Sequence, residues 1–164
     1  MTPAPPSPHV GHLIRLAQQI HTRAWNTEVS SEVTSPQVLL LRAIERKPHV
    51  DQRTLAALAS LDRSTTSVLV ERMTERGYIA KAPHPQDRRR HLLDLTPAGR
   101  ELLAEVIPRV ANLHHHLLGV LEPDDAADLV RLLAAFVERN DDLVRAEEVA
   151  DGGEPSGSPP RGRV

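Results

Sequence analysis

The first third of the chain shows a helical spacing of apolar side chains. Between Val10 and Trp25 they recur at three- and four-residue intervals, which predicts an amphipathic helix. Ser35 is predicted to cap a second helix, with Pro36 in its first turn, and Pro48 ends that helix. Two helices therefore open the fold.

Two short helices with their own capping residues follow. Asp51 is placed to cap a helix over residues 52–60, and Asp62 is placed to cap a longer one that runs to Arg76. Gly77 then supplies the left-handed residue that ends many helices. Adjoining short helices joined by a tight turn are typical of a helix-turn-helix, although any helical hairpin gives the same pattern.

A hairpin with a basic tip comes next. The segments YIAKA (78–82) and HLLDL (91–95) read as short strands, and HPQDRR (84–89) reads as the turn between them. Thr96 and Pro97 then restart helix, and a last helix begins near Pro123. The pattern predicts a mainly α fold with one small β-hairpin.

The first and last helices carry more apolar surface than a small helix-turn-helix core can cover. The stripe on the last helix comprises Leu129, Leu132, Leu133, Phe136 and Val137. Symmetric association of two copies is the simplest way to bury these faces, so we expect a homodimer.

Composition narrows the function. The chain has no cysteine, which excludes disulfides, thiolate metal sites and cysteine-based peroxide sensing. No apolar run is long enough to span a bilayer, and the proline-rich start lacks an export signal, so we expect a cytoplasmic protein without a membrane partner. There is no nucleophile with a base and no phosphate-binding glycine loop, so we expect neither an enzyme nor a cofactor.

The charges are distributed unevenly along the chain. Residues 63–100 carry eight basic and four acidic side chains, whereas residues 101–164 carry six basic and thirteen acidic ones. A basic segment inside a chain of net charge -2 fits a local phosphate-binding surface, although a solvated charged face gives the same asymmetry.

The ordered motifs carry a family resemblance. The helix-turn-helix segment DQRTLAALASLDRSTTSVLVERMTERGYI is followed by HPQDRRRHLLDLTPAGRELL, which holds D-R-R at 87–89 and L-T-P-A-G at 95–99. Over roughly residues 10–145 the chain resembles the MarR (multiple antibiotic resistance regulator) family of winged helix-turn-helix transcription factors. The resemblance implies a homodimer that binds a pseudo-palindromic operator in double-stranded DNA, usually as a repressor.

It also implies a division of the chain. We expect tails over 1–9 and 147–164, dimerisation segments over 10–34 and 101–146, and a winged helix-turn-helix DNA-binding domain over 35–100.

Two elements are expected to reach the DNA. The start of the recognition helix supplies Arg63, Ser64, Thr65, Thr66 and Ser67, although simple capping would also explain its hydroxyls. In the wing, Arg89 matches the family's minor-groove arginine, Asp87 is expected to support the tip, and Arg88, Arg90 and His91 are expected at phosphates. Gln52 and Arg53 begin the preceding helix and are expected near the DNA backbone.

The resemblance also implies a small aromatic or phenolic anion as the effector, since many members of the family bind one between the dimerisation helices and the DNA-binding lobe. His21 and Trp25 lie one turn apart and share a face, and Arg42 could supply a counter-charge. A core or interface role is the commoner fate of a sole tryptophan.

Two alternatives stay open from the sequence. Residues 114–116 are histidines, which raises a metal-responsive regulator, but adjacent helical residues point about 100° apart and do not converge on one ion. His12 and His21 are possible further ligands, and we expect no metal site. The other alternative is a winged-helix protein-interaction module, which the basic wing tip disfavours.

Overall fold

The computed structural model describes residues 9–87 and 90–140. It confirms a mainly helical chain with a small antiparallel sheet. The elements are α1 (Val10–Ala24), η1 (Trp25–Val29), α2 (Ser35–Arg46), β1 (Val50–Asp51), α3 (Gln52–Ala59), α4 (Arg63–Glu75), β2 (Ile79–Pro83), β3 (His91–Leu95), α5 (Pro97–Leu118) and α6 (Pro123–Arg139).

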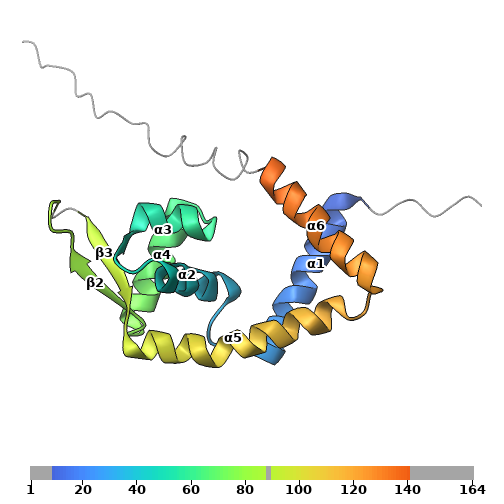
Figure 1. Cartoon of the computed structure of the whole chain (residues 1–164), viewed down its shortest axis with the longest axis horizontal. Coiled ribbons are helices and arrows are strands. Elements are labelled where there is room, and N and C mark those ends of the chain that lie inside the picture. The colour runs from blue at the N-terminus through green and yellow to red at the C-terminus, as the bar shows by residue number, and fades with distance from the viewer. Residues whose placement is uncertain (1–8, 88–89, 141–164) are drawn as a thin grey trace, which may run out of the picture.

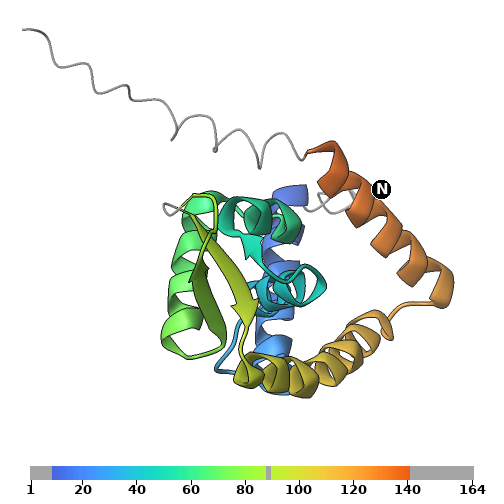
Figure 2. The ribbon, with the colours of Figure 1, turned by 60° about the vertical axis from the view of Figure 1, so that its left-hand side comes forward.

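The elements form a compact lobe and an arm. The lobe comprises α2, α3, α4 and the sheet, whose strand order is β1-β3-β2 (Figure 1). The long helix α5 leads from the lobe to the arm, which comprises α1 and α6, and a second view shows α6 standing away from the lobe (Figure 2). The helix-turn-helix is therefore presented at one end of the molecule and the apolar helices at the other.

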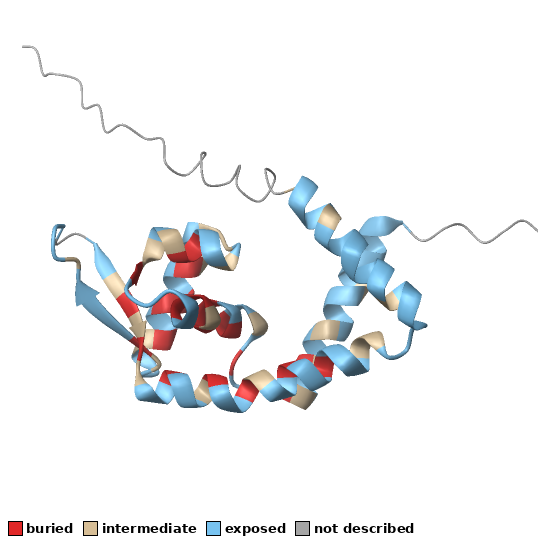
Figure 3. Ribbon diagram, viewed as in Figure 1, coloured by how far each residue is buried: buried red, intermediate tan, exposed pale blue. Residues whose placement is uncertain are grey.

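Burial follows the same division (Figure 3). Leu40, Leu41 and Ile44 of α2 and Met73 of α4 are fully buried in one core, which continues along α5 through Leu103. Neither α1 nor α6 has a buried residue. None of the helices in the described ranges is long and apolar enough to cross a bilayer.

The capping residues predicted for the helix-turn-helix are confirmed. Asp51 accepts hydrogen bonds from the N–H groups of Arg53 and Thr54, and Asp62 accepts one from Thr65. Gly77 adopts the left-handed conformation, with φ 76°, directly after the last turn of α4. The turn between α3 and α4 requires Ser60 to be left-handed as well, with φ 51°.

The structure corrects two local predictions. Thr34, not Ser35, precedes the first turn of α2, and its N–H donates to Oε1 of Gln37 in a capping box. The first helix ends at Ala24 and continues as a five-residue π-helix, a form that α-helical spacing does not reveal.

The sequence also missed the strand Val50–Asp51, which is too short for an alternating pattern and exists because it pairs with β3. The part of the last helix expected beyond residue 140 lies outside the described residues.

The start of α5 is packed directly onto the turn after α4. Oγ1 of Thr96 donates to the carbonyl of Gly77 at 2.6 Å, and the N–H of Thr96 donates to the carbonyl of Tyr78 at 3.1 Å. A Cβ atom at Gly99 would overlap the same Tyr78 carbonyl oxygen. The glycine of the L-T-P-A-G segment is therefore required by this close approach of two backbones.

We predict that Gly99→Ala destabilises the protein by about 1 to 3 kcal/mol, because the overlap with Tyr78 exceeds the gain in helix propensity. Gly11→Ala is the matched control, since nothing lies within 4 Å of a Cβ in that position of α1. Urea unfolding monitored by circular dichroism measures both changes. Equal stability of the two variants would contradict the packing constraint.

Candidate nucleic-acid interface and ligand pocket

The first turn of α4 is organised by one carboxylate. Oδ1 of Asp62 accepts the N–H of Thr65 at 2.7 Å and the hydroxyl of Ser64 at 2.6 Å. These hydrogen bonds, with Ser64 the strongest, lower the pKa of Asp62 from 3.8 to about 2. Asp62 is therefore ionised at neutral pH and keeps the helix start fixed.

The exposed face of α4 differs from the one predicted. Arg63, Ser64 and Ser67 are exposed, as a DNA-reading surface requires, whereas Thr65 is half-buried. Thr66 is fully buried and its hydroxyl donates to the carbonyl of Asp62 at 2.8 Å, so its side chain faces the core rather than the groove.

Val68 is a further exposed residue of α4 that the sequence did not single out. It is a 50% exposed apolar side chain one turn after Ser64 on the exposed face of α4. The signal was its spacing from Ser64, because residues four apart share a helix face. An apolar side chain at this place can contact a thymine methyl group.

The start of α3 is the second exposed part of the lobe. Asp51 fixes its first turn, Arg53 is exposed and Gln52 is half-buried. Both predicted residues therefore lie at the surface at the N-terminal end of their helix, where backbone N–H groups favour an anion.

The wing is built by β2 and β3, which pair in register from Ile79 with Leu95 to Pro83 with His91. Arg88 and Arg89 lie outside the described residues. Asp87, predicted to support the tip, accepts the N–H of Arg90 through its backbone carbonyl at 2.9 Å. His91 is exposed. Arg90 is engaged within the chain, because its Nη2 lies 2.9 Å from Oδ2 of Asp51.

A pocket of about 410 Å³ lies between α1 and the start of α2, within the size range of small-molecule sites. It contains the predicted pair His21 and Trp25, whose ring centroids are 5.9 Å apart. The other lining residues are Gln18, Thr22, Asn26, Thr34, Ser35 and Pro36. Arg42, the predicted counter-charge, is not among them.

Trp25 has a structural role in this pocket. Its side chain is 4% exposed, and its Nε1 donates to the carbonyl of Val33 at 2.7 Å. The indole N–H is therefore already bonded within the chain, and Trp25 can offer a ligand only the apolar part of its ring. His21, which is half-buried, is the ionisable side chain left on this wall.

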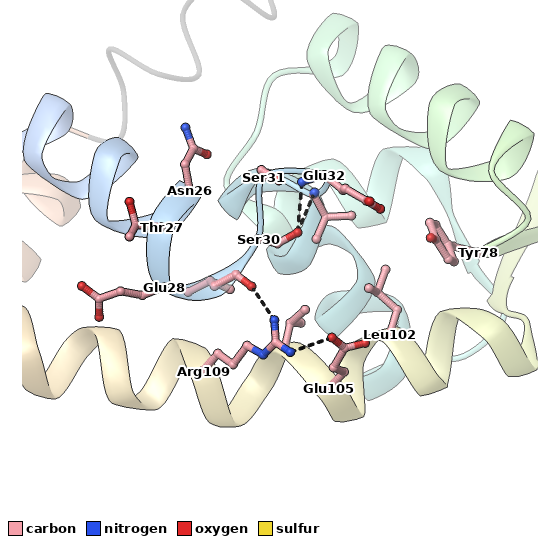
Figure 4. Close-up of a pocket in the computed structure, with 13 residues that line it drawn as sticks. Asn26, Thr27, Glu28, Ser30, Ser31, Glu32, Tyr78, Leu102, Glu105 and Arg109 are labelled. Carbon is pink, nitrogen blue, oxygen red and sulfur yellow. Dashed lines mark hydrogen bonds and ion pairs between the residues drawn. The ribbon is translucent and has the colours of Figure 1, made fainter.

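A second pocket, of about 450 Å³, lies on the side of η1 that faces α5 (Figure 4). Arg109 crosses it, donating from Nη1 to the carbonyl of Val29 at 3.2 Å and pairing through Nη2 with Glu105 at 2.9 Å. Glu28, Glu32 and Tyr78 also line it. Arg109 pairs with Glu105, Glu28 pairs with His116 and Glu32 pairs with Arg76, so these charges already have partners and the pocket is a weaker candidate for an aromatic anion.

The histidine run does not form a metal centre within the described part of the chain. His114 and His115 are exposed, and Nδ1 of His116 lies 2.8 Å from Oε1 of Glu28. No group of three or more metal-ligating side chains comes together among residues 9–87 and 90–140.

Comparisons with known proteins agree with this geometry. A family model described as "MarR family" matches residues 31–90. The transcriptional regulator HosA from Escherichia coli is 31% identical over 122 residues, which cover 74% of this chain and 90% of HosA.

Solved structures are similar over most of their length. The PcaV transcriptional regulator from Streptomyces coelicolor, in complex with its natural ligand, is 38% identical, with a TM-score of 0.77 over 84% of this chain and 98% of PcaV. Bordetella bronchiseptica BpsR, whose DNA binding is regulated by 6-hydroxynicotinic acid, is 30% identical, with a TM-score of 0.74 over 82% of this chain and 96% of BpsR.

Proposed function

This chain belongs to the MarR family of transcriptional regulators, and on that premise we propose that it represses transcription as a homodimer bound to a pseudo-palindromic operator. In this proposal the protein dissociates from the DNA when it binds a small aromatic or phenolic anion. The observation that carries the DNA-binding role is the exposed, capped start of α4, which stands beside a basic wing.

In the proposed complex, α4 enters the major groove. Arg63, Ser64 and Ser67 contact base edges or phosphates, and Val68 contacts an apolar base edge. Gln52 and Arg53 contact the DNA backbone, while the wing presents Arg88, Arg89 and His91 to the minor groove and its phosphates.

We predict that the protein binds DNA from upstream of its own coding region, that the affinity falls steeply as salt rises, and that unrelated competitor DNA does not displace it. Arg89→Ala weakens this binding by about 1 to 3 kcal/mol per half-site, whereas Arg131→Ala on α6 does not. Gel-shift titrations at two salt concentrations measure both effects. Absence of binding by the wild type at low salt contradicts the proposed function.

The exposed apolar side chains of the arm support the proposed homodimer. Leu132, Leu133, Phe136 and Val137 on α6 are between 51% and 58% exposed, and Val10 on α1 is 70% exposed. Exposed apolar stripes of this kind are characteristic of an interface, and a closed two-fold dimer would bury them on both copies.

We predict that Leu133→Asp dissociates the dimer, because it places a carboxylate in the centre of the apolar stripe. Arg131→Asp places the same group on the opposite face of α6 and leaves the dimer intact. Sedimentation velocity measures the two masses. A dimeric Leu133→Asp variant would place the interface elsewhere.

The pocket between α1 and α2 is the proposed effector site. It has an apolar wall of Trp25 and Pro36, and the side chains of Gln18, His21 and Thr22 supply polar groups. This combination suits a small ring that carries a carboxylate or hydroxyl group. Regulation of BpsR by 6-hydroxynicotinic acid supports an aromatic acid as the class of effector.

We predict that 6-hydroxynicotinate or salicylate weakens DNA binding by the wild type and that His21→Ala loses this response while binding DNA normally. Ser31→Ala, which changes only the second pocket, keeps the response. Anisotropy titrations with each acid measure the change in DNA affinity. If neither acid weakens DNA binding by the wild type, the result contradicts the proposed effector class.

A further inference from the structure

The carboxylate of Asp51 joins two parts of the proposed DNA-binding surface. Its Oδ1 caps α3 by accepting the N–H groups of Arg53 and Thr54, both at 3.1 Å. Its Oδ2 accepts the hydroxyl of Thr54 at 2.8 Å and lies 2.9 Å from Nη2 of Arg90. One side chain therefore holds the start of α3 and the wing residue that precedes β3.

Besides this ion pair, two longer side-chain contacts join the wing strands to the lobe: Lys81 lies 3.8 Å from Glu71 of α4, and His49 lies 3.6 Å from Asp94. The pairing between β1 and β3 consists of Val50 with Leu93 and Asp51 with Leu92. In β2 only Ile79 is buried, so the outer part of the hairpin has little apolar packing to fix its angle to the lobe. The ion pair between Asp51 and Arg90 adds a contact next to this short pairing, at the residue that precedes β3.

The pair is also electrostatically matched. Partial burial raises the pKa of Asp51. The hydrogen bonds from Thr54, the positive charge of Arg90 and the N–H of Arg53 together lower the pKa by more than burial raises it, so the net pKa lies below 3.8. The side chain of Asp51 is 18% exposed and that of Arg90 is 49% exposed. Asp51 is thus a charged partner at neutral pH, in a less solvated setting than a typical surface ion pair.

We propose that Asp51 and Arg90 are a positioning pair, which sets the angle of the wing to α3 and α4, and that Arg90 supports operator binding through Asp51 rather than by neutralising a phosphate. This inference rests on the proposed function. If Asp51 positions the wing, its negative charge strengthens specific binding to DNA. Simple electrostatics predicts the opposite, because a negative charge near the phosphates weakens binding.

The test is a double-mutant cycle of Asp51→Asn, Arg90→Gln and the double variant. Asparagine caps a helix as well as aspartate does, so Asp51→Asn removes the charge and keeps the cap of α3. Binding is measured by fluorescence anisotropy on a duplex that the wild type selects from random DNA, and on an unrelated duplex, over a range of salt.

The positioning role predicts that each single variant loses roughly tenfold in affinity for the selected duplex, and that the double variant is no weaker than Arg90→Gln. Affinity for the unrelated duplex changes little, because no phosphate contact is lost. Arg53→Gln is the comparison for a phosphate contact, and it lowers the salt slope by about one per subunit.

A different result overturns the inference. If Asp51→Asn binds the selected duplex as tightly as the wild type or more tightly, while Arg90→Gln weakens both duplexes and lowers the salt slope as Arg53→Gln does, then Arg90 is a phosphate contact. A wild type that selects no duplex overturns the proposed function itself, so the two failures are distinguishable. Melting temperature and sedimentation confirm that the variants are folded dimers, and Asp51→Ser, another good N-cap, replaces Asp51→Asn if that variant is unstable.

Discussion

The close approach of α5 to the turn after α4 is the contact on which the arrangement of lobe and arm depends. Thr96 donates hydrogen bonds to the carbonyl groups of Gly77 and Tyr78, and Gly99 has no side chain that would overlap the Tyr78 backbone. The recognition helix, the start of β2 and the start of α5 thereby share one small junction. Because α5 continues from this junction to the arm, the position of α4 is linked to whatever covers the apolar faces of α1 and α6.

A second link runs through the loop between η1 and α2. Trp25 bonds the carbonyl of Val33, and Arg76, which caps the C-terminus of α4, donates from Nη1 to the carbonyl of Glu32 at 2.8 Å. Arg76 also lies over the ring of Tyr78, 5.3 Å from its centroid. The wall of the proposed effector pocket and the end of the recognition helix therefore contact neighbouring residues of one loop.

Local chemistry made much of the lobe predictable. Asp51, Asp62 and Thr96 act as caps through the N–H groups of the next turn, and Gly77 is left-handed in a place where other residues are strained, so each signal lies within a few residues of sequence. The two-residue strand β1 has no such signal, because only its pairing with β3 defines it.

The site was harder to predict because side-chain partners come from far along the chain. Spacing placed His21 and Trp25 on one face correctly, but not the bond from Trp25 to Val33. Likewise, the charge of Arg90 suggested a phosphate, and only the fold brings Asp51 to it. Thr66 was within reach of sequence reasoning, since it shares the buried face of Val70 and Met73 at four- and seven-residue intervals.

In the proposed complex, two copies of this chain place two recognition helices on one face of a DNA duplex. The decisive experiment is hydroxyl-radical footprinting of the dimer on its selected operator. We expect two protected patterns related by two-fold symmetry, with centres separated by about one helical turn of 10 base pairs or a multiple of it. A single asymmetric protected stretch would contradict this arrangement.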